Sequence, residues 1–235
     1  MSPESERLSV AVVDSGVFAG HPHLAGIPVS GFGVVGVEPP FRREEAFDDR
    51  TGHGTAAAAA IAWSEPRVSI LAVRVLDAEL RTTSAALAEA IVGAADAGAS
   101  VINLSLGSTR DESRSMLAEA VAYASASGAV CVANAHPRGR SLWPGDLPTV
   151  ISATSHRDCP RADLFTVRGL LPRFVAHGFP RPVEGRAPTD NFFGPSFACA
   201  HVTAAVVSLL QRSPGLEFGG VVEALEARAN GEVDP

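Results

Sequence analysis

The chain has 235 residues, 46% of them hydrophobic and 19% charged, which is enough apolar material for one full-sized core. Its formal net charge is −7, and no basic stripe indicates a nucleic-acid partner. No apolar run reaches the length of a membrane span, and the first residues lack the pattern of a secretory signal peptide. We therefore expect a cytoplasmic protein that binds neither nucleic acid nor membrane.

The three cysteines, Cys131, Cys159 and Cys199, are widely spaced and form no C-x-x-C pair. An odd number of separated cysteines in a protein without a secretion signal favours reduced thiols that pack as small hydrophobic side chains. We predict no metal site and no cofactor.

Apolar strand-like runs alternate with helical segments along most of the chain. Residues 8–13 are a valine-rich run that ends at Asp14-Ser15-Gly16, which is typical of a buried strand entering a turn. The alanine-rich residues 52–62 predict a helix. The same reasoning predicts further strands at residues 68–76, 100–104, 129–133 and 149–153, and further helices at residues 83–97, 111–127, 196–211 and 219–228.

Strands that alternate with helices of about ten or more residues form βαβ units with a parallel sheet between helices. We expect an α/β fold, a three-layer sandwich with a mainly parallel β-sheet flanked by helices. No linker divides the chain, so residues 1–235 are predicted to form a single domain.

Three short patterns carry reactive side chains, in the order carboxylate, imidazole and hydroxyl. They are Val12-Val13-Asp14-Ser15-Gly16, Gly52-His53-Gly54-Thr55 and Gly194-Pro195-Ser196-Phe197-Ala198. A serine hydroxyl is a weak nucleophile until a base accepts its proton, and a buried carboxylate must hold that base in one tautomer. Pro195 suits the first turn of a helix, which places Ser196 at a helix N-terminus that favours a developing oxyanion.

This arrangement resembles the subtilisin family of serine proteases, and the similarity extends from about residue 8 to residue 210. The resemblance implies a subtilisin-like fold with Asp14, His53 and Ser196 as the catalytic triad. The run Val101-Ile102-Asn103-Leu104-Ser105-Leu106-Gly107 is similar to the family's substrate strand. This similarity implies that Ser105, Leu106 and Gly107 bind an extended peptide through backbone hydrogen bonds.

The sequence departs from the family pattern in the loop that supplies a side-chain donor to the oxyanion. Family members carry an asparagine shortly after the strand that corresponds to residues 129–133, whereas an ungapped alignment places Pro137 there, which has no donor. Asn134 lies three residues earlier and is our candidate, with His136 as a second one. Ala56 is a milder departure, because family members often have a second histidine there.

Other patterns receive structural interpretations. Gly31-Phe32-Gly33-Val34-Val35-Gly36 matches a dinucleotide fingerprint, but Pro39-Pro40 follows it and prevents a helix from starting on the third glycine. His21 and His23 flank Pro22 and are predicted to mark a turn rather than a metal site. Phe47-Asp48-Asp49-Arg50 is interpreted as a solvated turn that leads to His53.

We predict a serine endopeptidase that cleaves peptide bonds in a peptide or protein substrate through an acyl-enzyme, and that matures a dedicated peptide precursor. The altered oxyanion loop leaves an alternative, a degenerate protease retained as a binding module or as a subunit of a maturation complex. Acyl transfer to an amine instead of water uses the same residues and also stays open.

Overall fold

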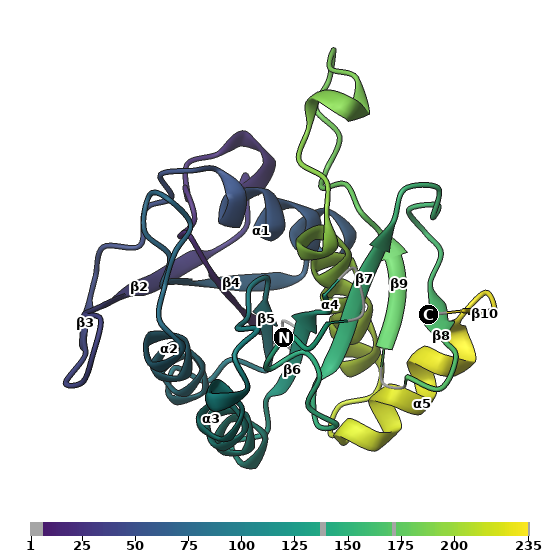
Figure 1. Ribbon diagram of the computed structural model, residues 1–235. Helices are drawn as coiled ribbons and strands as arrows, with labels where there is room; N and C mark the ends of the chain where they lie inside the picture. Colours follow the sequence, from purple (N-terminus) through teal and green to yellow (C-terminus); the bar gives the residue numbers. More distant parts are fainter. Residues whose placement is uncertain (1–6, 137–139, 171–172, 235) are drawn as a thin grey trace, which may run out of the picture.

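The computed structural model describes residues 7–136, 140–170 and 173–234. Within these ranges, no helix combines the length and the apolar character needed to cross a membrane. The described residues include ten strands, which form one sheet in the spatial order β10-β8-β9-β7-β6-β5-β1-β4-β2-β3 (Figure 1). The strands are β1 (Leu8–Asp14), β2 (Val29–Val35), β3 (Arg42–Glu44), β4 (Val68–Arg74), β5 (Val101–Leu104), β6 (Val130–Asn134), β7 (Ile151–His156), β8 (Phe165–Val167), β9 (Arg173–His177) and β10 (Glu232–Val233).

The β2–β3 and β8–β9 pairs are antiparallel, and the other neighbouring strands run parallel. The predicted mainly parallel α/β sheet is therefore confirmed. Five α-helices lie within the described ranges, together with the short 3₁₀ turns η1 (Pro22–Leu24), η2 (Asp111–Ser113) and η3 (Pro188–Asp190). The helices are α1 (His53–Ser64), α2 (Ser84–Asp96), α3 (Arg114–Ala126), α4 (Pro195–Arg212) and α5 (Phe218–Arg228).

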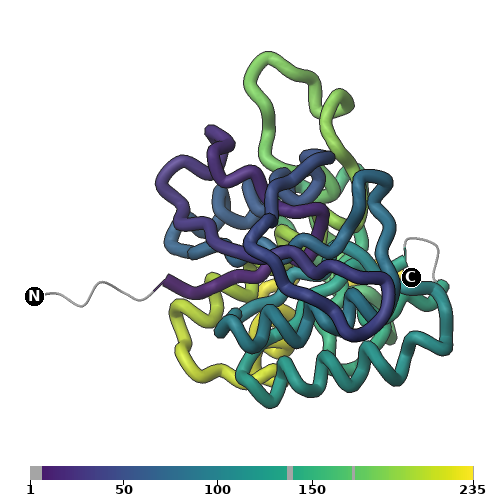
Figure 2. Tube along the Cα trace, turned by 90° about the vertical axis from the view of Figure 1, so that its left-hand side faces the viewer, coloured from purple at the N-terminus to yellow at the C-terminus, as the bar shows by residue number. Residues whose placement is uncertain are grey.

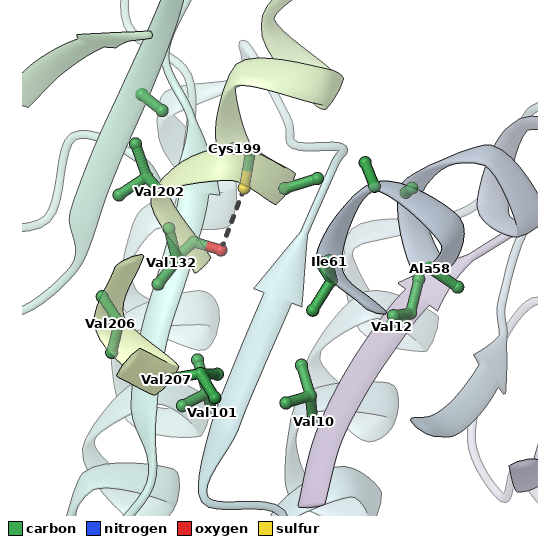
Figure 3. Packing of buried hydrophobic residues seen from close by; sticks show 14 of the residues in the cluster. Val10, Val12, Ala58, Ile61, Val101, Val132, Cys199, Val202, Val206 and Val207 are labelled. Carbon is green, nitrogen blue, oxygen red and sulfur yellow. Dashed lines mark hydrogen bonds between the residues drawn. The ribbon is translucent and has the colours of Figure 1, made fainter. Parts of the chain in front are cut away.

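Both faces of the sheet are covered, because the central strands carry apolar side chains in both directions. In β1, Val10 and Val12 pack with residues of α1, α4 and α5, whereas Ala11 and Val13 pack with α2 and α3 on the opposite face. Figure 3 shows the first of these interfaces, where valines of β1, β5 and β6 meet side chains of α1 and α4. A strand buried on both sides reads as a continuous apolar run, which is why residues 8–13 were recognisable from sequence.

Helix α1 is unusual because it has no polar face. Residues 57–62 are all buried, five of them alanine. These small side chains allow the helix to pack closely against β1 and α4, with η1 on its outer side. A helix that is apolar all round is stable only inside the protein, so α1 is held in place by its surroundings.

The sequence did not predict five of the described strands, β2, β3, β8, β9 and β10. The G-x-G-x-x-G run lies mostly within β2 and leads to β3, which confirms that no helix starts on its third glycine. A Cβ atom on Gly31 would clash with the Ala72 carbonyl oxygen, so this glycine serves the close approach of β2 to β4.

Candidate active site

Three neighbouring parallel strands, β6, β5 and β1, bring polar residues to one edge of the sheet. Asp14 ends β1, Ser105 directly follows β5, and Asn134 ends β6. The first turns of α1 and α4 reach the same edge, where His53 contacts Asp14 and Ser196 contacts Ser105. In open α/β sheets, ligands bind beyond the carboxyl ends of the strands, so this edge is the candidate active site.

The imidazole of His53 is held by both oxygens of the Asp14 carboxylate. The distances from His53 Nδ1 are 2.8 Å to Asp14 Oδ1 and 2.9 Å to Oδ2. Asp14 is fully buried, and the Ser15 backbone N–H donates to its Oδ1 at 2.7 Å. Because Nδ1 donates its hydrogen to the carboxylate, Nε2 of neutral His53 is left as a proton acceptor.

The pKa of His53 is set by opposing effects. Burial lowers the pKa of this imidazole, but the hydrogen bond and the charge of Asp14, together with the charge of Asp49, outweigh burial and raise it above 6.5. The carboxylate thus makes His53 a stronger base than a free imidazole.

Asp49 organises the turn in front of α1, and the prediction of a solvated turn at residues 47–50 is wrong for this residue. Its Oδ1 accepts the backbone N–H groups of Thr51 and Gly52, each at 2.9 Å. Its Oδ2 accepts the N–H and the hydroxyl of Thr55 at 2.9 and 2.6 Å. Burial raises the pKa of Asp49, but these hydrogen bonds outweigh it, so that the pKa lies below its usual value. The carboxylate therefore caps α1 as an anion at the positive end of the helix dipole.

Glycine at position 54 allows α1 to begin directly against the end of β1. A Cβ atom on Gly54 would clash with the Gly16 carbonyl oxygen and would lie 3.0 Å from the Cβ of Asp14. The Gly54 N–H donates to Ser15 Oγ at 3.1 Å, and this hydroxyl in turn donates to Asp49 Oδ1 at 2.9 Å. This contact fixes the distance between the carboxylate and the imidazole.

Ser196 lies in the first turn of α4, which begins at Pro195, one residue before the predicted start. Its hydroxyl donates to the Ser105 carbonyl oxygen at 3.2 Å. Across the described ranges, no hydrogen bond joins this hydroxyl to His53. The ring of Phe197, the residue after Ser196, lies 5.3 Å from the His53 ring, so the first turn of α4 reaches the imidazole.

A buried polar network supports the backbone of Ser196. The Ser105 hydroxyl donates to the Ser196 carbonyl oxygen at 3.3 Å, and Asn103 Nδ2 donates to the Ser105 hydroxyl at 2.9 Å. Asn103 Oδ1 accepts from Thr203 Oγ1 at 3.0 Å and from Cys199 Sγ at 3.2 Å. Both Asn103 and Thr203 are fully buried, so the network connects β5 to the interior of α4.

The predicted peptide-binding segment, Ser105 to Gly107, directly follows β5 and leaves the sheet at the carboxyl ends of its strands. The backbone N–H groups of Leu106 and Gly107 donate to no backbone carbonyl elsewhere in the described chain. Beyond them, Ser108 forms an antiparallel bridge with Trp143, with two hydrogen bonds of 2.8 Å. The segment is thus anchored at its far end, and the N–H groups in its middle have no backbone acceptor among the described residues.

Asn134 lies half-buried at the end of β6, beside the Ser105 strand. In the parts of the chain that the structure covers, its Oδ1 is the one buried side-chain oxygen or nitrogen without a hydrogen-bond partner. Pro137, the position reached by ungapped alignment, falls outside the described residues. His136 is described and is half-buried.

The remaining candidates have structural roles. His21 caps η1 by accepting the His23 backbone N–H at 3.1 Å, which confirms the predicted turn. Cys199 is buried, and burial raises the pKa of its thiol to about 12, so it packs as a neutral side chain. No group of three or more His, Cys, Asp or Glu side chains is placed to hold a metal ion within residues 7–136, 140–170 and 173–234.

Two aromatic residues at the site were missed by sequence reasoning. The rings of Phe192 and Phe197 lie 5.9 and 5.3 Å from the His53 ring and stack on each other at 5.7 Å. Phe197 was interpreted only as part of an apolar helix face, and Phe192 precedes the helix in a segment without periodicity. Asp49 did carry a signal, because acidic residues are favoured just before a helix begins.

Comparisons with known proteins agree with this geometry. Thermitase from Thermoactinomyces vulgaris is 34% identical over 242 aligned residues, which cover 97% of this chain and 82% of thermitase. The fold matches that of sphericase with a TM-score of 0.73 at 22% identity, over 97% of this chain and 86% of sphericase. It also matches the prenylagaramide maturation protease PagA with a TM-score of 0.70 at 22% identity, over 94% of this chain and 83% of PagA.

A match to the Subtilase family (peptidase S8) covers residues 5–229. Because this match takes in nearly the whole sheet and all five helices, the chain belongs to the subtilase family of serine proteases.

Proposed function

We propose that this subtilase is an active endopeptidase in which Asp14, His53 and Ser196 form the catalytic triad. The observation that carries the proposal is the bond from His53 Nδ1 to both oxygens of a fully buried Asp14. An isolated buried carboxylate is costly unless it is paired, and here the pairing prepares a base next to a serine at a helix N-terminus.

The reaction starts when the Ser196 hydroxyl turns from the Ser105 carbonyl to His53 Nε2. His53 accepts the proton while Ser196 Oγ attacks the peptide carbonyl, and backbone N–H groups at the start of α4 stabilise the oxyanion. His53 then gives the proton to the leaving amine. Water, activated in the same way, hydrolyses the acyl-enzyme, and an amine in its place would give acyl transfer.

The substrate segment before the cleaved bond is proposed to pair with Ser105, Leu106 and Gly107. The backbone N–H groups of Leu106 and Gly107 support this role, because they have no backbone acceptor in the described ranges and a peptide can pair with such donors. Asn134 is proposed as the side-chain donor to the oxyanion, since its carboxamide lies at the end of the neighbouring strand.

We also propose that the substrate is a dedicated peptide precursor processed in the cytoplasm. One of the structural neighbours carries the name of a maturation protease, and that likeness of fold supports a comparable role here. The protein would process this precursor alone or in a maturation complex.

A fluorophosphonate probe tests the triad directly. The probe should label the wild-type protein at Ser196, and labelling should disappear in Ser196→Ala and fall strongly in His53→Ala. Mass spectrometry of the labelled peptide identifies the site, and circular dichroism confirms that the variants are folded. Labelling that persists in Ser196→Ala would overturn the assignment.

A second candidate function, a degenerate protease that only binds peptides, is favoured by one observation. The Ser196 hydroxyl donates to the Ser105 carbonyl and not to the base. A folded wild-type protein that binds peptides but is never labelled by the probe would support this alternative.

A further inference from the structure

A cavity of about 360 Å³ lies beside His53, between η1, the first turns of α1 and the chain that leads to α4. Three exposed apolar side chains line it, Phe18, Val183 and Phe192, with 53%, 37% and 42% of their surfaces accessible. Ala56 and Ala59 also line the cavity, on the α1 side. Exposed large apolar groups that converge on one hollow indicate a binding site rather than chance exposure.

The position of the cavity relates it to the reaction. Phe192 lines the cavity and also contacts His53 edge-on, with 5.9 Å between the ring centroids. The described lining includes none of Ser105, Leu106 or Gly107, so the cavity lies away from the proposed binding segment for the acyl part. Because His53 passes its proton to the leaving amine, the peptide that follows the cleaved bond begins next to this imidazole.

The polar side chains around the cavity are mainly basic. Arg50 and Arg181 line it, and Arg50 makes no ion pair with any described residue. Asp49 is the one carboxylate in the lining, and its oxygens already accept hydrogen bonds from Ser15, Thr51, Gly52 and Thr55. Two arginines thus face one carboxylate in the described lining, so the net charge of these three groups is positive and attracts an acidic group on the ligand.

We propose that this cavity binds the substrate segment that follows the cleaved bond, and that it selects a bulky apolar side chain accompanied by an acidic residue. The inference rests on the proposed endopeptidase function and names a feature of its substrate. Side chains of an extended peptide alternate in direction, so the apolar residue is the first or second after the cleaved bond.

Binding to the inactive Ser196→Ala protein tests the cavity without requiring catalysis. The probes are C-terminally fluorescent peptides with free amino ends, Phe-Asp-Gly-Gly, Gly-Phe-Asp-Gly and Gly-Gly-Asp-Gly, measured by fluorescence anisotropy. One of the two phenylalanine peptides should bind about tenfold or more tightly than the third, because an aromatic ring is buried. Replacement of its aspartate by lysine should weaken binding further.

A second substitution fills the cavity from the α1 side. Ala56→Met, added to Ser196→Ala, should abolish the preference for phenylalanine. Ala122→Met, on the exposed face of α3, is the matched control and should leave the preference unchanged. Thermal melts of both variants verify that the fold is retained. Equal binding of all three peptides, or a preference that survives Ala56→Met, would overturn the inference.

Cleavage of a random peptide library by the active protein separates this inference from the proposed function. Products read by mass spectrometry should be enriched in apolar and acidic residues directly after the cleaved bond. Probe labelling and cleavage without that enrichment would retain the protease and reject the cavity assignment. Selective peptide binding without any labelling of Ser196 would retain the cavity as a peptide-binding site and reject the protease.

Discussion

The protonation of His53 connects its environment to the pH dependence of activity. In the proposed mechanism only neutral His53 can accept the serine proton, and the pKa of His53 is raised above 6.5 because the bond and charge of Asp14 outweigh burial. We expect kcat/KM to rise with pH through a midpoint above 6.5, measured on a peptide substrate at constant ionic strength. A profile that is flat between about pH 5 and 8 would contradict the assignment of His53 as the base.

The same pKa shift affects stability in the opposite direction. A folded-state pKa above the unfolded value means that protonated His53 stabilises the fold below the unfolded pKa, and that this contribution is lost as pH rises through the folded pKa. Neutral His53, the form that the proposed mechanism requires, therefore contributes less to stability than protonated His53.

Asn134 allows catalysis and stability to be separated experimentally. If its amide donates to the oxyanion, Asn134→Ala should lower kcat by roughly 10²–10³ with little change in KM. Because Asn134 Oδ1 has no partner within the described chain, the substitution should change the melting temperature only slightly. His136→Ala is the control, and a kcat loss confined to that variant would show that the imidazole is the donor instead.

At the scale of elements, Asp49 is expected to stabilise the first turn of α1. Asp49→Ala removes the acceptor of three backbone N–H groups and of the Ser15, Thr51 and Thr55 hydroxyls. The substitution should cost about 2–4 kcal/mol in the free energy of unfolding. Urea unfolding measures this loss, with exposed Asp48→Ala as the control. Equal stability of the two variants would refute the capping role.

The pH dependence of the Asp49 contribution follows from the sign of its shift. The pKa of Asp49 is lowered in the fold, because the hydrogen bonds that it accepts outweigh burial. Its contribution is therefore fully present above the unfolded pKa of about 3.9 and is lost as pH falls through the folded value.

The elements also show what could be predicted from sequence. Helices α2 and α4 and strand β1 have periodic or continuous apolar patterns together with cap residues, and they were found within a residue or two. Strand β3, with the sequence Arg-Arg-Glu, is exposed along its whole length, and only its pairing with β2 makes it a strand. The partner β2 lies only a short connection earlier in the chain, but three exposed polar residues carry no apolar alternation that would indicate a strand.

The candidate site divides in a similar way. Asp14, His53 and Ser196 were recognised because each sits in a short local motif at the end of a strand or the start of a helix. The contact of Phe192 with His53 was not predictable, because it depends on the path of a long irregular segment between β9 and α4. In the sequence, Asn103 looks like an ordinary strand residue. Its carboxamide oxygen gains hydrogen-bond donors only because α4 packs against β5.

At the scale of the whole molecule, α4 must dock on the sheet before Ser196 meets the other reactive residues. The buried bond from Thr203 to Asn103 links that docking to the Ser105 hydroxyl under Ser196. Thr203→Val leaves the volume nearly unchanged but deprives Asn103 Oδ1 of a donor, and should cost about 1–3 kcal/mol of stability. Chemical denaturation measures the loss.

A positioning role predicts more than lost stability. Under conditions where Thr203→Val is fully folded, kcat should still be reduced while KM changes little, and Thr203→Ser should restore both stability and kcat because it returns the hydroxyl. An unchanged kcat in folded Thr203→Val would show that the network stabilises the fold but does not position Ser196.

Residues 182–190, between β9 and α4, form an arm that is exposed throughout and stands away from the body of the protein in both views (Figures 1 and 2). Its base is closed by the bond from Asn191 Nδ2 to the Arg181 carbonyl at 3.1 Å. Exposed loops of this kind are the usual targets of proteolytic nicking. A single nick here would leave Asp14 and His53 on one polypeptide and Ser196 on another, held together by buried packing and hydrogen bonds without a peptide link. Self-digestion could therefore yield a two-chain species whose reactive residues come from separate fragments.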